Sequence, residues 1–523
     1  MNLRGAVLRW FGERARLGRS GRSLARHTAA RMDTDSPQFA HHAASNRVWY
    51  WPALTPTLSP KERETKVALN KRQKLRGGVL RWLCFALLFA FRAERVTAES
   101  DDEFLERLER AAFDYFWKEA NPTNGLIRDR SKPDSKCSIA AVGFGLSAIN
   151  IGVERGWISR PTGRVRVLTT LRTFAEGQQG EQPDGVIGHR GWSYHFLELN
   201  SGHRAWKCEL SSIDTALLLA GVVDAREFYT GAEPDEVQIR EFADQLVARV
   251  DWAWMTDGGD TFTMGWYPER GFLRSRWVGY NEAMLLYLLG LGASGGSTTN
   301  DSGTRASNST SVQWEAWTRG YHWRTNYGYA YVEFAPLFGH QYSHCWVDFR
   351  GIADAFMRER GLTYFENSRR ATLAQRAYCI ANAGRFSNYG SLEWGITACD
   401  GPKGYAARGA PPSENDDGTL APTAAGGSLP FAPEFCLPTL RHFEQRYGPK
   451  LWGPYGFRDA FNITENWWAT DTLGIDQGPI LLMIENHRTG NVWRRMMRSP
   501  IIQRGLNRAG FSLISAQPTT SRP

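Results

Sequence analysis

Apolar residues recur at helical spacing along most of the chain after residue 98. In residues 104–119, Phe104, Leu108 and Ala112 fall on one face of a helix, and the segment 100–103 before them has the form of a capping box. The same spacing predicts helices over 138–155, 162–176, 211–229, 235–255, 281–291, 343–358, 363–382, 433–447 and 477–487, with shorter candidates near 312–319 and 458–461. No series of evenly spaced, alternating strands competes with this pattern, so we expect an all-α fold.

Long connections rich in glycine, proline and aromatic residues separate these helices. Loops of such length inside a compact domain usually serve function. The repeated helix-loop pattern has no linker, which indicates one domain over residues 99–523. About twelve helices suggest six hairpins closed into an (α/α)6 barrel with the loops at one mouth, although the number of helices also allows an open solenoid. The longest connections are 180–210, 257–280, 323–342 and 386–430, and residues 300–310 have the composition of a surface insertion.

The net charge of +9 is concentrated at the N-terminus. Residues 1–98 hold 19 basic and 6 acidic side chains, and the rest of the chain holds 44 basic and 48 acidic ones. A basic tail ahead of a mildly acidic body is typical of a targeting segment and argues against a surface that binds nucleic acid.

Residues 71–98 have the composition of a signal peptide. A basic stretch precedes the apolar run 82–91, and Val96-Thr97-Ala98 forms a loose cleavage site. The apolar run is short compared with the roughly 20 residues that span a bilayer. We therefore expect cleavage, no stable membrane span and a periplasmic or secreted protein, with a retained anchor as the alternative. Residues 1–70 are Arg/Ala/Ser-rich and broken by proline, as expected for a disordered segment or an extension upstream of the true start codon.

Six cysteines follow residue 98, and none of them lies in a Cys/His cluster with zinc spacing. We therefore expect no metal and no cofactor. One or two disulfides could form in an oxidising compartment, but the spacing does not determine the pairing. The six are Cys137, Cys208, Cys345, Cys379, Cys399 and Cys436.

Acidic side chains occur where long loops run into apolar helices. They are Glu209 and Asp214, then Glu282, then Asp471 and Asp476. Each following helix is apolar nearly all round, as an inner helix should be, and helices of one ring would bring the acids to one mouth. An acid in a first turn can also act only as a cap, worth about 0.3–1 kcal/mol, and Ser211 and Asn281 are ordinary N-cap residues. The desolvation of several carboxylates nevertheless favours a cleft.

Carboxyl groups across an aromatic cleft fit glycoside hydrolysis. One acid, its pKa raised by an apolar wall, would protonate the glycosidic oxygen, and an ionised one would activate water or attack the anomeric carbon. Loop histidines at 189, 195, 340 and 344 are interpreted as hydrogen-bonded residues and not as metal ligands. Stacking rings and hydroxyl partners for a sugar are expected from Asp214, Trp192, Tyr194, Tyr280, Asn281, Tyr331, Glu393, Trp394, Asp400 and Tyr405.

Six segments resemble the glycoamylase-like domain that bacterial endo-β-1,2-glucanases share with cyclic β-1,2-glucan synthases. They occur in the same order over nearly the whole part of the chain that follows residue 98. The resemblance implies an (α/α)6 barrel and, for the hydrolases, inverting cleavage of β-1,2-glucan. The segments are 113–130, 138–160, 209–221, 277–292, 393–409 and 473–493.

This resemblance assigns provisional roles to the acids. Glu282 matches the acid of the Y-N-E-A motif and is expected to be the general acid, whereas Glu209 matches the E-L-S-x-I-D-T-A region that supplies a second carboxylate. For the base, Asp476 in L-G-I-D-Q-G-P is the first choice and Asp471 the second.

Other functions and modes of action fit the same pattern. A transglycosylase, a glucoamylase-type hydrolase of another glucan, a polysaccharide lyase and a non-catalytic glycan-binding protein remain as alternatives. The favoured interpretation is an inverting endo-β-1,2-glucanase, while the sequence by itself does not distinguish endo from exo action or inversion from retention, and it gives neither chain-length preference nor oligomeric state.

Overall fold

The computed structural model describes residues 99–293 and 311–514. The predictions for residues 1–70, 71–98 and 300–310 lie outside these described residues. From Asp101 onward, the described residues belong to one compact unit. None of the helices described in it combines the length and the apolar composition needed to cross a membrane.

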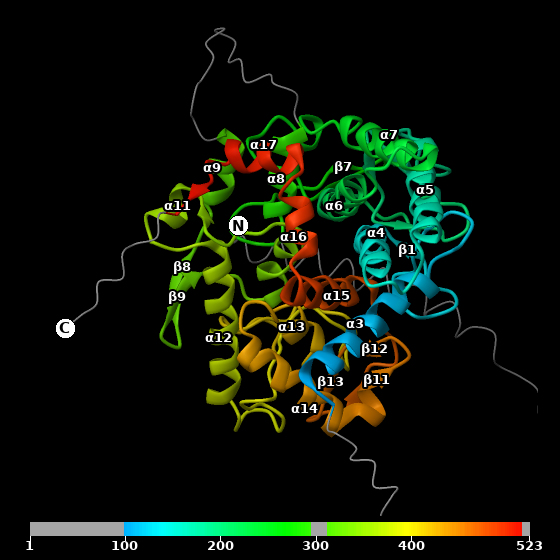
Figure 1. The fold of residues 1–523 in the computed structure, drawn as a ribbon. Helices are drawn as coiled ribbons and strands as arrows, with labels where there is room; N and C mark the ends of the chain where they lie inside the picture. The colour runs from blue at the N-terminus through cyan, green and yellow to red at the C-terminus, as the bar shows by residue number, and fades with distance from the viewer. Residues whose placement is uncertain (1–98, 294–310, 515–523) are drawn as a thin grey trace, which may run out of the picture. The chain divides into compact units, whose positions relative to one another are not determined.

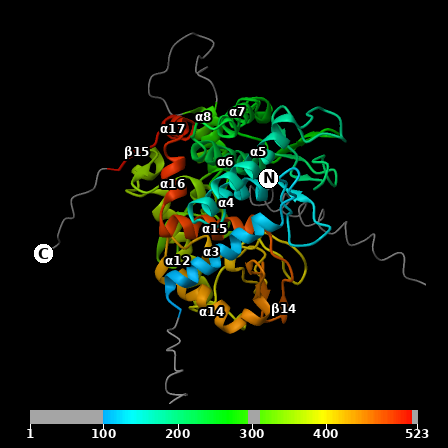
Figure 2. The ribbon, with the colours of Figure 1, turned by 45° about the vertical axis from the view of Figure 1, so that its right-hand side comes forward.

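The helices of this unit form two sets that differ in burial. In chain order, each buried helix follows one or more helices that expose a face to solvent, so the buried set forms an inner ring and the other set surrounds it (Figures 1 and 2). The prediction of an all-α (α/α)6 barrel is confirmed. The inner helices are α4 (Ile139–Glu154), α6 (Ser212–Phe228), α8 (Met284–Ala293), α10 (Tyr342–Trp346), α13 (Pro422–Gly426) and α15 (Gly474–Arg488). The outer helices are α3 (Asp101–Lys118), α5 (Arg160–Glu176), α7 (Pro234–Ala248), α9 (Val312–Thr318), α12 (Tyr364–Ala381), α14 (Pro433–Leu451) and α17 (Pro500–Arg508).

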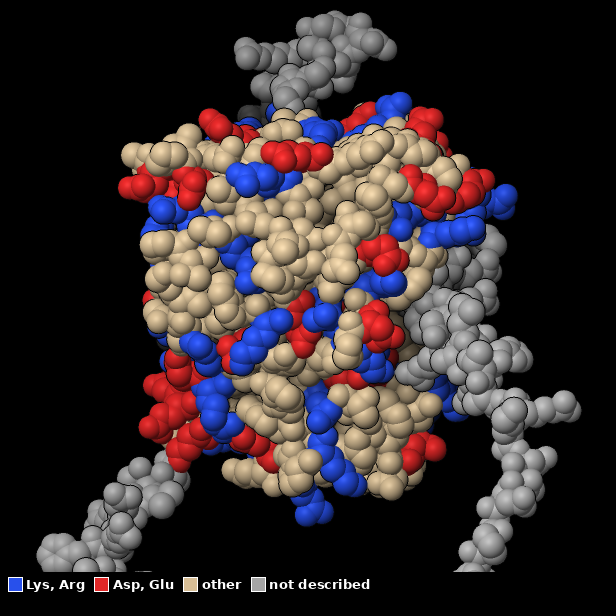
Figure 3. Space-filling view, turned by 90° about the vertical axis from the view of Figure 1, so that its right-hand side faces the viewer, with Lys and Arg blue, Asp and Glu red and all other residues tan. Residues whose placement is uncertain are grey.

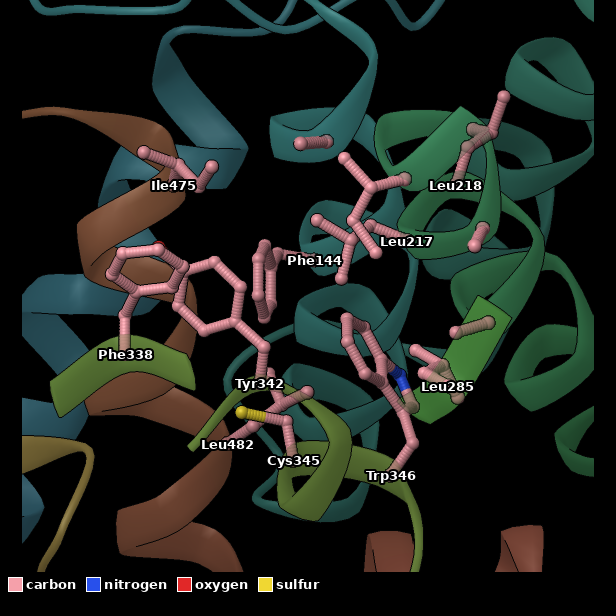
Figure 4. Close-up of a cluster of buried hydrophobic side chains, with 14 of the residues drawn as sticks. Phe144, Leu217, Leu218, Leu285, Phe338, Tyr342, Cys345, Trp346, Ile475 and Leu482 are labelled. Carbon is pink, nitrogen blue, oxygen red and sulfur yellow. The ribbon is translucent and has the colours of Figure 1, made fainter. Parts of the chain in front are cut away.

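Side chains of the inner helices fill the axis of the barrel (Figure 4). Phe144 of α4 stacks on Trp346 of α10 with ring centroids 4.8 Å apart and meets Tyr342 edge-on at 5.8 Å. Leu285 of α8 and Leu482 of α15 point into the same cluster. A core packed in this way leaves no channel through the ring, so any ligand site has to lie at an end of the barrel.

Two inner helices, α4 and α6, cross with their backbones in contact. A Cβ atom added to Gly143 would lie 2.1 Å from the carbonyl oxygen of Leu217, and one added to Gly221 would lie 2.1 Å from the carbonyl oxygen of Gly143. Glycine is therefore the residue that allows this close approach.

Short antiparallel strand pairs brace the loops that connect the helices. The pair β1 (Cys137–Ser138) and β4 (Phe196–Leu197) ends where α4 begins, and the group β5 (Leu210–Ser211), β6 (Gly265–Tyr267) and β7 (Gly271–Phe272) ends where α6 begins. The loops at the start of these inner helices are thus held by backbone hydrogen bonds. The remaining pairs are β2 (Gly188–His189) with β3 (Trp192–Ser193), β8 (Trp323–Asn326) with β9 (Tyr329–Val332), β10 (Ile352–Ala353) with β15 (Ser512–Leu513), β11 (Trp452–Gly453) with β12 (Gly456–Phe457), and β13 (Phe461–Asn462) with β14 (Trp467–Trp468).

Two helix predictions are wrong. The predicted helix 343–358 is two helices, α10 and α11 (Ala355–Arg358), because Gly351 turns the chain with φ +70° and Asp354 caps a new start by accepting the amide of Met357. The candidate near 458–461 is extended, because Phe461 pairs with Leu420 and with the strand β14. The short helices α13 and α16 (Asn491–Met496) were not predicted, and neither was α17.

The six cysteines of the described residues are all free and buried, so the structure contains none of the disulfides that the sequence allowed. On the face shown in Figure 3, acidic and basic side chains are interspersed. That face therefore presents no broad field of one sign.

Candidate functional site

All inner helices run in the same direction, so the acids near their N-terminal ends lie at one end of the ring. An outer helix and the inner helix that follows it run in opposite directions, so all inner helices begin at the same end of the ring. Glu209 precedes α6, Glu282 precedes α8 and Asp476 lies in the first turn of α15. The loops at this end form what we call the mouth of the barrel.

Glu209 is held at the mouth by side chains that bind both of its carboxylate oxygens. Its Oε1 lies 2.8 Å from Nδ1 of His195, and its Oε2 accepts a hydrogen bond of 3.4 Å from the hydroxyl of Tyr267. The other ring nitrogen of His195 lies 3.5 Å from Oδ2 of Asp214. All four residues are buried, so the imidazole joins two carboxylates away from solvent.

Asp214 is also part of the helix cap that the sequence allowed. The hydroxyl of Ser211 donates to its Oδ2 at 2.6 Å, and the Ser211 oxygen accepts the amide of Asp214. Its carboxylate therefore fixes the start of α6 and the orientation of His195. A direct contact between Asp214 and a sugar stays a prediction.

Glu282 lies just before α8, with 2% of its surface exposed. The backbone around it is tied to α10, because the hydroxyl of Ser343 donates to the Glu282 carbonyl oxygen and accepts the amide of Leu285. Asn281 accepts the amide of Ala283 through its side chain, as a capping residue does. The carboxyl group is thus presented from a rigid segment with an apolar helix behind it.

A hollow of about 670 Å³, including its open mouth, lies beside this segment. Tyr280 and Asn281 form part of its wall, together with the acidic residues Glu333 and Glu414. The predicted binding residues Tyr280 and Asn281 therefore do face a cavity. The other lining residues are Val278, Gly279, Gly320, His322, Phe334, Ala335, Pro336, Ala407 and Pro412.

A second group of acids surrounds the start of α15. Arg130 donates to Asp400 at 3.0 Å and to Asp471 at 3.1 Å, and Lys132 lies 2.8 Å from Asp471. Burial would raise the pKa of Asp471, but Lys132 and Arg130 outweigh it and hold that pKa below its ordinary value. Asp471 is therefore a firmly ionised, ion-paired group.

Asp459 belongs to the same group, although it was not among the predicted acids. It is 3% exposed, and its Oδ2 accepts the backbone amide of Asp400 at 2.6 Å. Burial and the charge of Asp400 raise the pKa of Asp459. Asp459 lies between Arg458 and Ala460 and does not precede an apolar helix, which is the pattern that marked the other acids.

One loop links the two groups of acids. Arg130 forms a β-bridge with Leu473, immediately before α15, while Cys137 pairs with Leu197. The amide of Ile139 donates to the carbonyl oxygen of His195 at 3.3 Å. The segment 130–139 thus runs from the acids of α15 to the residues that hold Glu209.

Four other predicted binding residues are buried in the structure. Trp192 and Trp394 are fully buried, and Trp192 packs against Trp252 and Phe262 in the core. Tyr194 and Tyr331 are also buried. Their contact with a sugar therefore stays a prediction.

Three further predictions concern polar groups in the loops. Glu393 accepts hydrogen bonds from His442 and Tyr447, so it ties its loop to α14. Asp400 and Tyr405 lie in a partly exposed loop, and Asp400 reaches the group at α15 through Arg130. Asp400 is thus brought to the acids, whereas Glu393 is not.

All four histidines of the sequence prediction are hydrogen-bonded, as predicted, and His189 accepts a bond of 3.3 Å from Nε of Arg190. His195 binds Glu209, Nε2 of His340 lies 3.2 Å from the Phe334 carbonyl oxygen, and Nε2 of His344 lies 3.1 Å from the Ser368 hydroxyl. The contacts of His195, Tyr267 and Arg130 with these acids were not predicted, because the partners are 14, 58 and 341 residues apart along the chain.

Comparison with known proteins supports this description. A family model described as "Glycoamylase: Putative glucoamylase" matches residues 274–500. An exo beta-1,2-glucooligosaccharide sophorohydrolase (non-reducing end) from Parabacteroides distasonis is 31% identical over 432 residues, which cover 78% of this chain and 58% of that protein. The chain thus spans less than two thirds of the length of this curated relative.

Solved structures extend the similarity. A protein from Bacteroides uniformis, also described as a "putative glucoamylase", superposes with a TM-score of 0.70. It is 34% identical, and the match covers 79% of this chain and 98% of that one. An endo-beta-1,2-glucanase from Chitinophaga pinensis, solved with sophorotriose and glucose, gives a TM-score of 0.68 at 28% identity, over 79% of this chain and 99% of that one. The resemblance carried by the six sequence segments is confirmed, and the chain belongs to the glycoamylase family.

Proposed function

We propose that this protein is a glycoside hydrolase that cleaves β-1,2-glucan. The observation that carries the proposal is the presence of buried carboxyl groups at the starts of three inner helices, α6, α8 and α15, all at the same end of the ring. The named activities of the Parabacteroides distasonis and Chitinophaga pinensis relatives supply the substrate class.

In this proposal Glu282 is the general acid. Its carboxyl group is almost completely buried ahead of an apolar helix, and such a position favours the uncharged form that can protonate the glycosidic oxygen. The departing sugar then carries away the proton, and the ionised Glu282 is reprotonated from solvent.

Asp476 is the proposed base, and it takes a proton from the attacking water. The start of α15 favours its ionised form, since the helix N-terminus carries a partial positive charge. Asp471 is the weaker candidate, because Arg130 and Lys132 already neutralise its charge and lower its basicity. We assign Asp471 to fixing the loop.

Glu209 is proposed to bind sugar hydroxyl groups as the second carboxylate of the mouth. His195 and Tyr267 fix its orientation, so it can accept hydrogen bonds at a constant position. Inversion is the proposed stereochemical course, with water placed between the sugar and Asp476.

The proposed setting is the periplasm or the exterior of the cell, after removal of residues 71–98. It rests on the basic and apolar composition of that segment. We propose no nucleic-acid partner, because the chain after residue 98 holds more acidic than basic side chains.

The test is incubation of the purified protein with β-1,2-, β-1,3- and α-1,4-glucans, followed by sizing of the products. We expect release of short oligosaccharides from the β-1,2-glucan alone, and proton NMR of the first products should show inverted anomers. Equal cleavage of the α-1,4-glucan would point to a glucoamylase-type activity. Unsaturated, ultraviolet-absorbing products would point to a lyase.

A further inference from the structure

The hairpin of β8 and β9 extends from the wall of the hollow at the mouth. His322 and Glu333, which flank its two strands, both line the hollow, and the Glu333 amide donates to the His322 carbonyl oxygen at 2.8 Å. The strand β9 packs along α12, and the chain turns back at Tyr327 and Gly328 (Figure 1). Because a strand rises about 3.3 Å per residue, this turn lies about 13 Å from the edge of the hollow. A ligand that reaches the turn therefore extends beyond the hollow.

The turn carries an accessible aromatic side chain. Tyr327 is 44% exposed, more than any other aromatic residue of the described ranges 99–293 and 311–514. Its ring lies 6.0 Å from that of Tyr378, almost perpendicular to it, and its hydroxyl lies 3.5 Å from the side-chain nitrogen of Asn382. These few contacts leave nearly half of the residue accessible to a ligand.

The backbone of the turn makes tyrosine an unfavourable residue at this position. Tyr327 has φ +51° and Gly328 has φ +84°, so both central residues of the two-residue loop are left-handed, as in a type I′ turn. Asn, Asp and Gly adopt this conformation readily, whereas a bulky side chain rarely does. An exposed aromatic residue on a strained backbone contributes little to folding, which points to a role in binding.

A second loop of the hollow leads to the same place. Glu414 lines the hollow, and Asp416, two residues further along, accepts a hydrogen bond of 2.7 Å from the hydroxyl of Tyr378. Tyr378 lies in the last turn of α12, which is an outer helix and therefore ends at the mouth. The loop that carries Glu414 and the hairpin that carries Glu333 thus converge near Tyr327, on the mouth side of the ring.

The hairpin face that leads from the hollow to the turn carries polar groups. The side-chain amide of Asn326 donates to the carboxylate of Glu333 at 3.1 Å, so this face of β8 borders the hollow. Arg324 lies on the same face, two residues earlier, and is exposed. Amide, carboxylate and guanidinium groups bind sugar hydroxyls, and an aromatic ring stacks on the apolar face of a sugar. The hairpin thus combines the two kinds of contact that a sugar subsite needs.

We propose that Tyr327 stacks on a sugar ring of bound β-1,2-glucan and forms a distal subsite, joined to the hollow by the hairpin face that carries Asn326 and Glu333. This inference rests on the proposed function, which supplies the occupant. Because the subsite lies outside the hollow, it adds binding energy for long chains without changing the chemical step. The protein should therefore prefer long glucans to short ones.

Kinetics on β-1,2-glucans of two lengths test the subsite. Tyr327→Ala removes the ring, so KM for a long glucan should rise by about 3-fold to 10-fold while kcat stays within about twofold. The ratio of kcat/KM on the long glucan to kcat/KM on a short oligosaccharide should fall accordingly. Tyr327→Phe and Tyr327→Trp keep a ring and should hold KM for the long glucan within about twofold of the wild-type value.

A third substitution separates binding from folding. Tyr327→Asn suits the positive φ, so this variant should unfold at the wild-type temperature or above it, yet its KM should rise as in Tyr327→Ala. Lower stability with an unchanged KM would show a purely structural tyrosine and overturn the inference. Val165→Ala is the control, because Val165 is 58% exposed on α5, across the ring from α12 (Figures 1 and 2), and its loss should leave KM unchanged.

Calorimetric binding distinguishes failure of this inference from failure of the proposed function. A long β-1,2-glucan is titrated into Glu282→Gln and into the double variant Glu282→Gln/Tyr327→Ala, whose Kd should be about 3-fold to 10-fold higher. Equal Kd values, with hydrolysis by the wild-type protein, would overturn the subsite and leave the proposed function intact. A wild-type protein that binds the glucan in a Tyr327-dependent way but cleaves none would refute the proposed function and keep the subsite. A protein that neither binds nor cleaves it would overturn both.

Discussion

Glu282 and Asp471 are both buried acids at the mouth, but their neighbours favour different protonation states. Glu282 has the apolar helix α8 behind it, whereas Asp471 binds Arg130 and Lys132. An apolar wall favours a carboxyl group that keeps its proton, and two cations favour one that is always ionised. The first state suits a general acid and the second suits a structural anchor.

Replacing Glu282 with Gln is expected to lower kcat on β-1,2-glucan by about 100-fold or more, because the amide keeps the shape but cannot protonate the leaving oxygen. The unfolding temperature should change little. Reducing-end assays and thermal unfolding measure the two effects. Glu236→Gln, at a buried glutamate of the outer helix α7, is the matched control and should retain activity. Near-normal hydrolysis by Glu282→Gln would exclude Glu282 as the acid.

Asp459 should also make stability depend on pH. Its pKa is raised to about 7 in the folded protein from 3.8, because burial and the charge of Asp400 oppose ionisation. Between these values the folded state binds more protons than the unfolded state, so this residue's contribution to the free energy of unfolding falls as pH rises, by up to about 1.4 kcal/mol per pH unit. Asp459→Asn removes that dependence.

Thermal unfolding of the wild-type protein and Asp459→Asn at pH 4, 5, 6 and 7 measures the effect. The variant should gain stability relative to the wild type at each step up in pH. A difference that stays constant with pH would show that Asp459 titrates normally in the folded state.

At the scale of elements, the crossing of α4 and α6 sets how closely the inner helices pack. Gly143→Ala would place a methyl group against the backbone of Leu217, and neither helix can move without disturbing the filled axis. We expect the free energy of unfolding, measured with a denaturant, to fall by about 1–3 kcal/mol or more. Gly384→Ala, where an added methyl group meets nothing within 4 Å, should cost under about 0.5 kcal/mol. Equal effects of the two substitutions would contradict the close crossing.

The sequence predicted the long helices well, because each carries several turns of apolar spacing. The predicted segments 363–382 and 138–155 nearly match α12 and α4. Short buried helices such as α13 have too few turns to show a period, and the extended conformation of Phe461 depends on its pairing with Leu420, which is distant along the chain.

The same reasoning explains which parts of the site could be predicted. Glu209, Glu282 and Asp476 were found because a local pattern marks an acid ahead of an apolar helix. Asp459 and Arg130 contact partners that only the fold brings near, since Asp459 is 59 residues from Asp400 and Arg130 is 341 residues from Asp471. The local sequence pattern identifies the acids, whereas the residues that contact them are brought near by the tertiary structure.

At the scale of the whole molecule, the proposed site and a group of ion pairs lie at opposite ends of the inner helices. The far end of α15 carries Glu485, which pairs with Arg155 at the end of α4, while Arg488 binds Glu109 of α3. These buried ion pairs fasten the outer helix α3 to the inner ring. Substitutions at the mouth can therefore alter chemistry without loosening this fastening.

The arrangement of α3 also predicts what the N-terminal segment contributes. Phe104, Leu108, Phe113 and Phe116 of α3 are buried, and α3 packs against α4 and α15. A chain that begins at Glu99 keeps these contacts and loses only the basic segment, so it should match the full chain in unfolding temperature and in kcat on β-1,2-glucan.

A chain that begins at residue 120 lacks α3, exposes the surfaces of α4 and α15 that it covered, and leaves Arg155 and Arg488 without Glu109. It should therefore fail to fold cooperatively at any temperature in a calorimetric scan. A stable, active chain without α3 would show that the ring closes without this helix. A chain from Glu99 that unfolds well below the full-length protein would instead show that the basic segment contributes to the folded state.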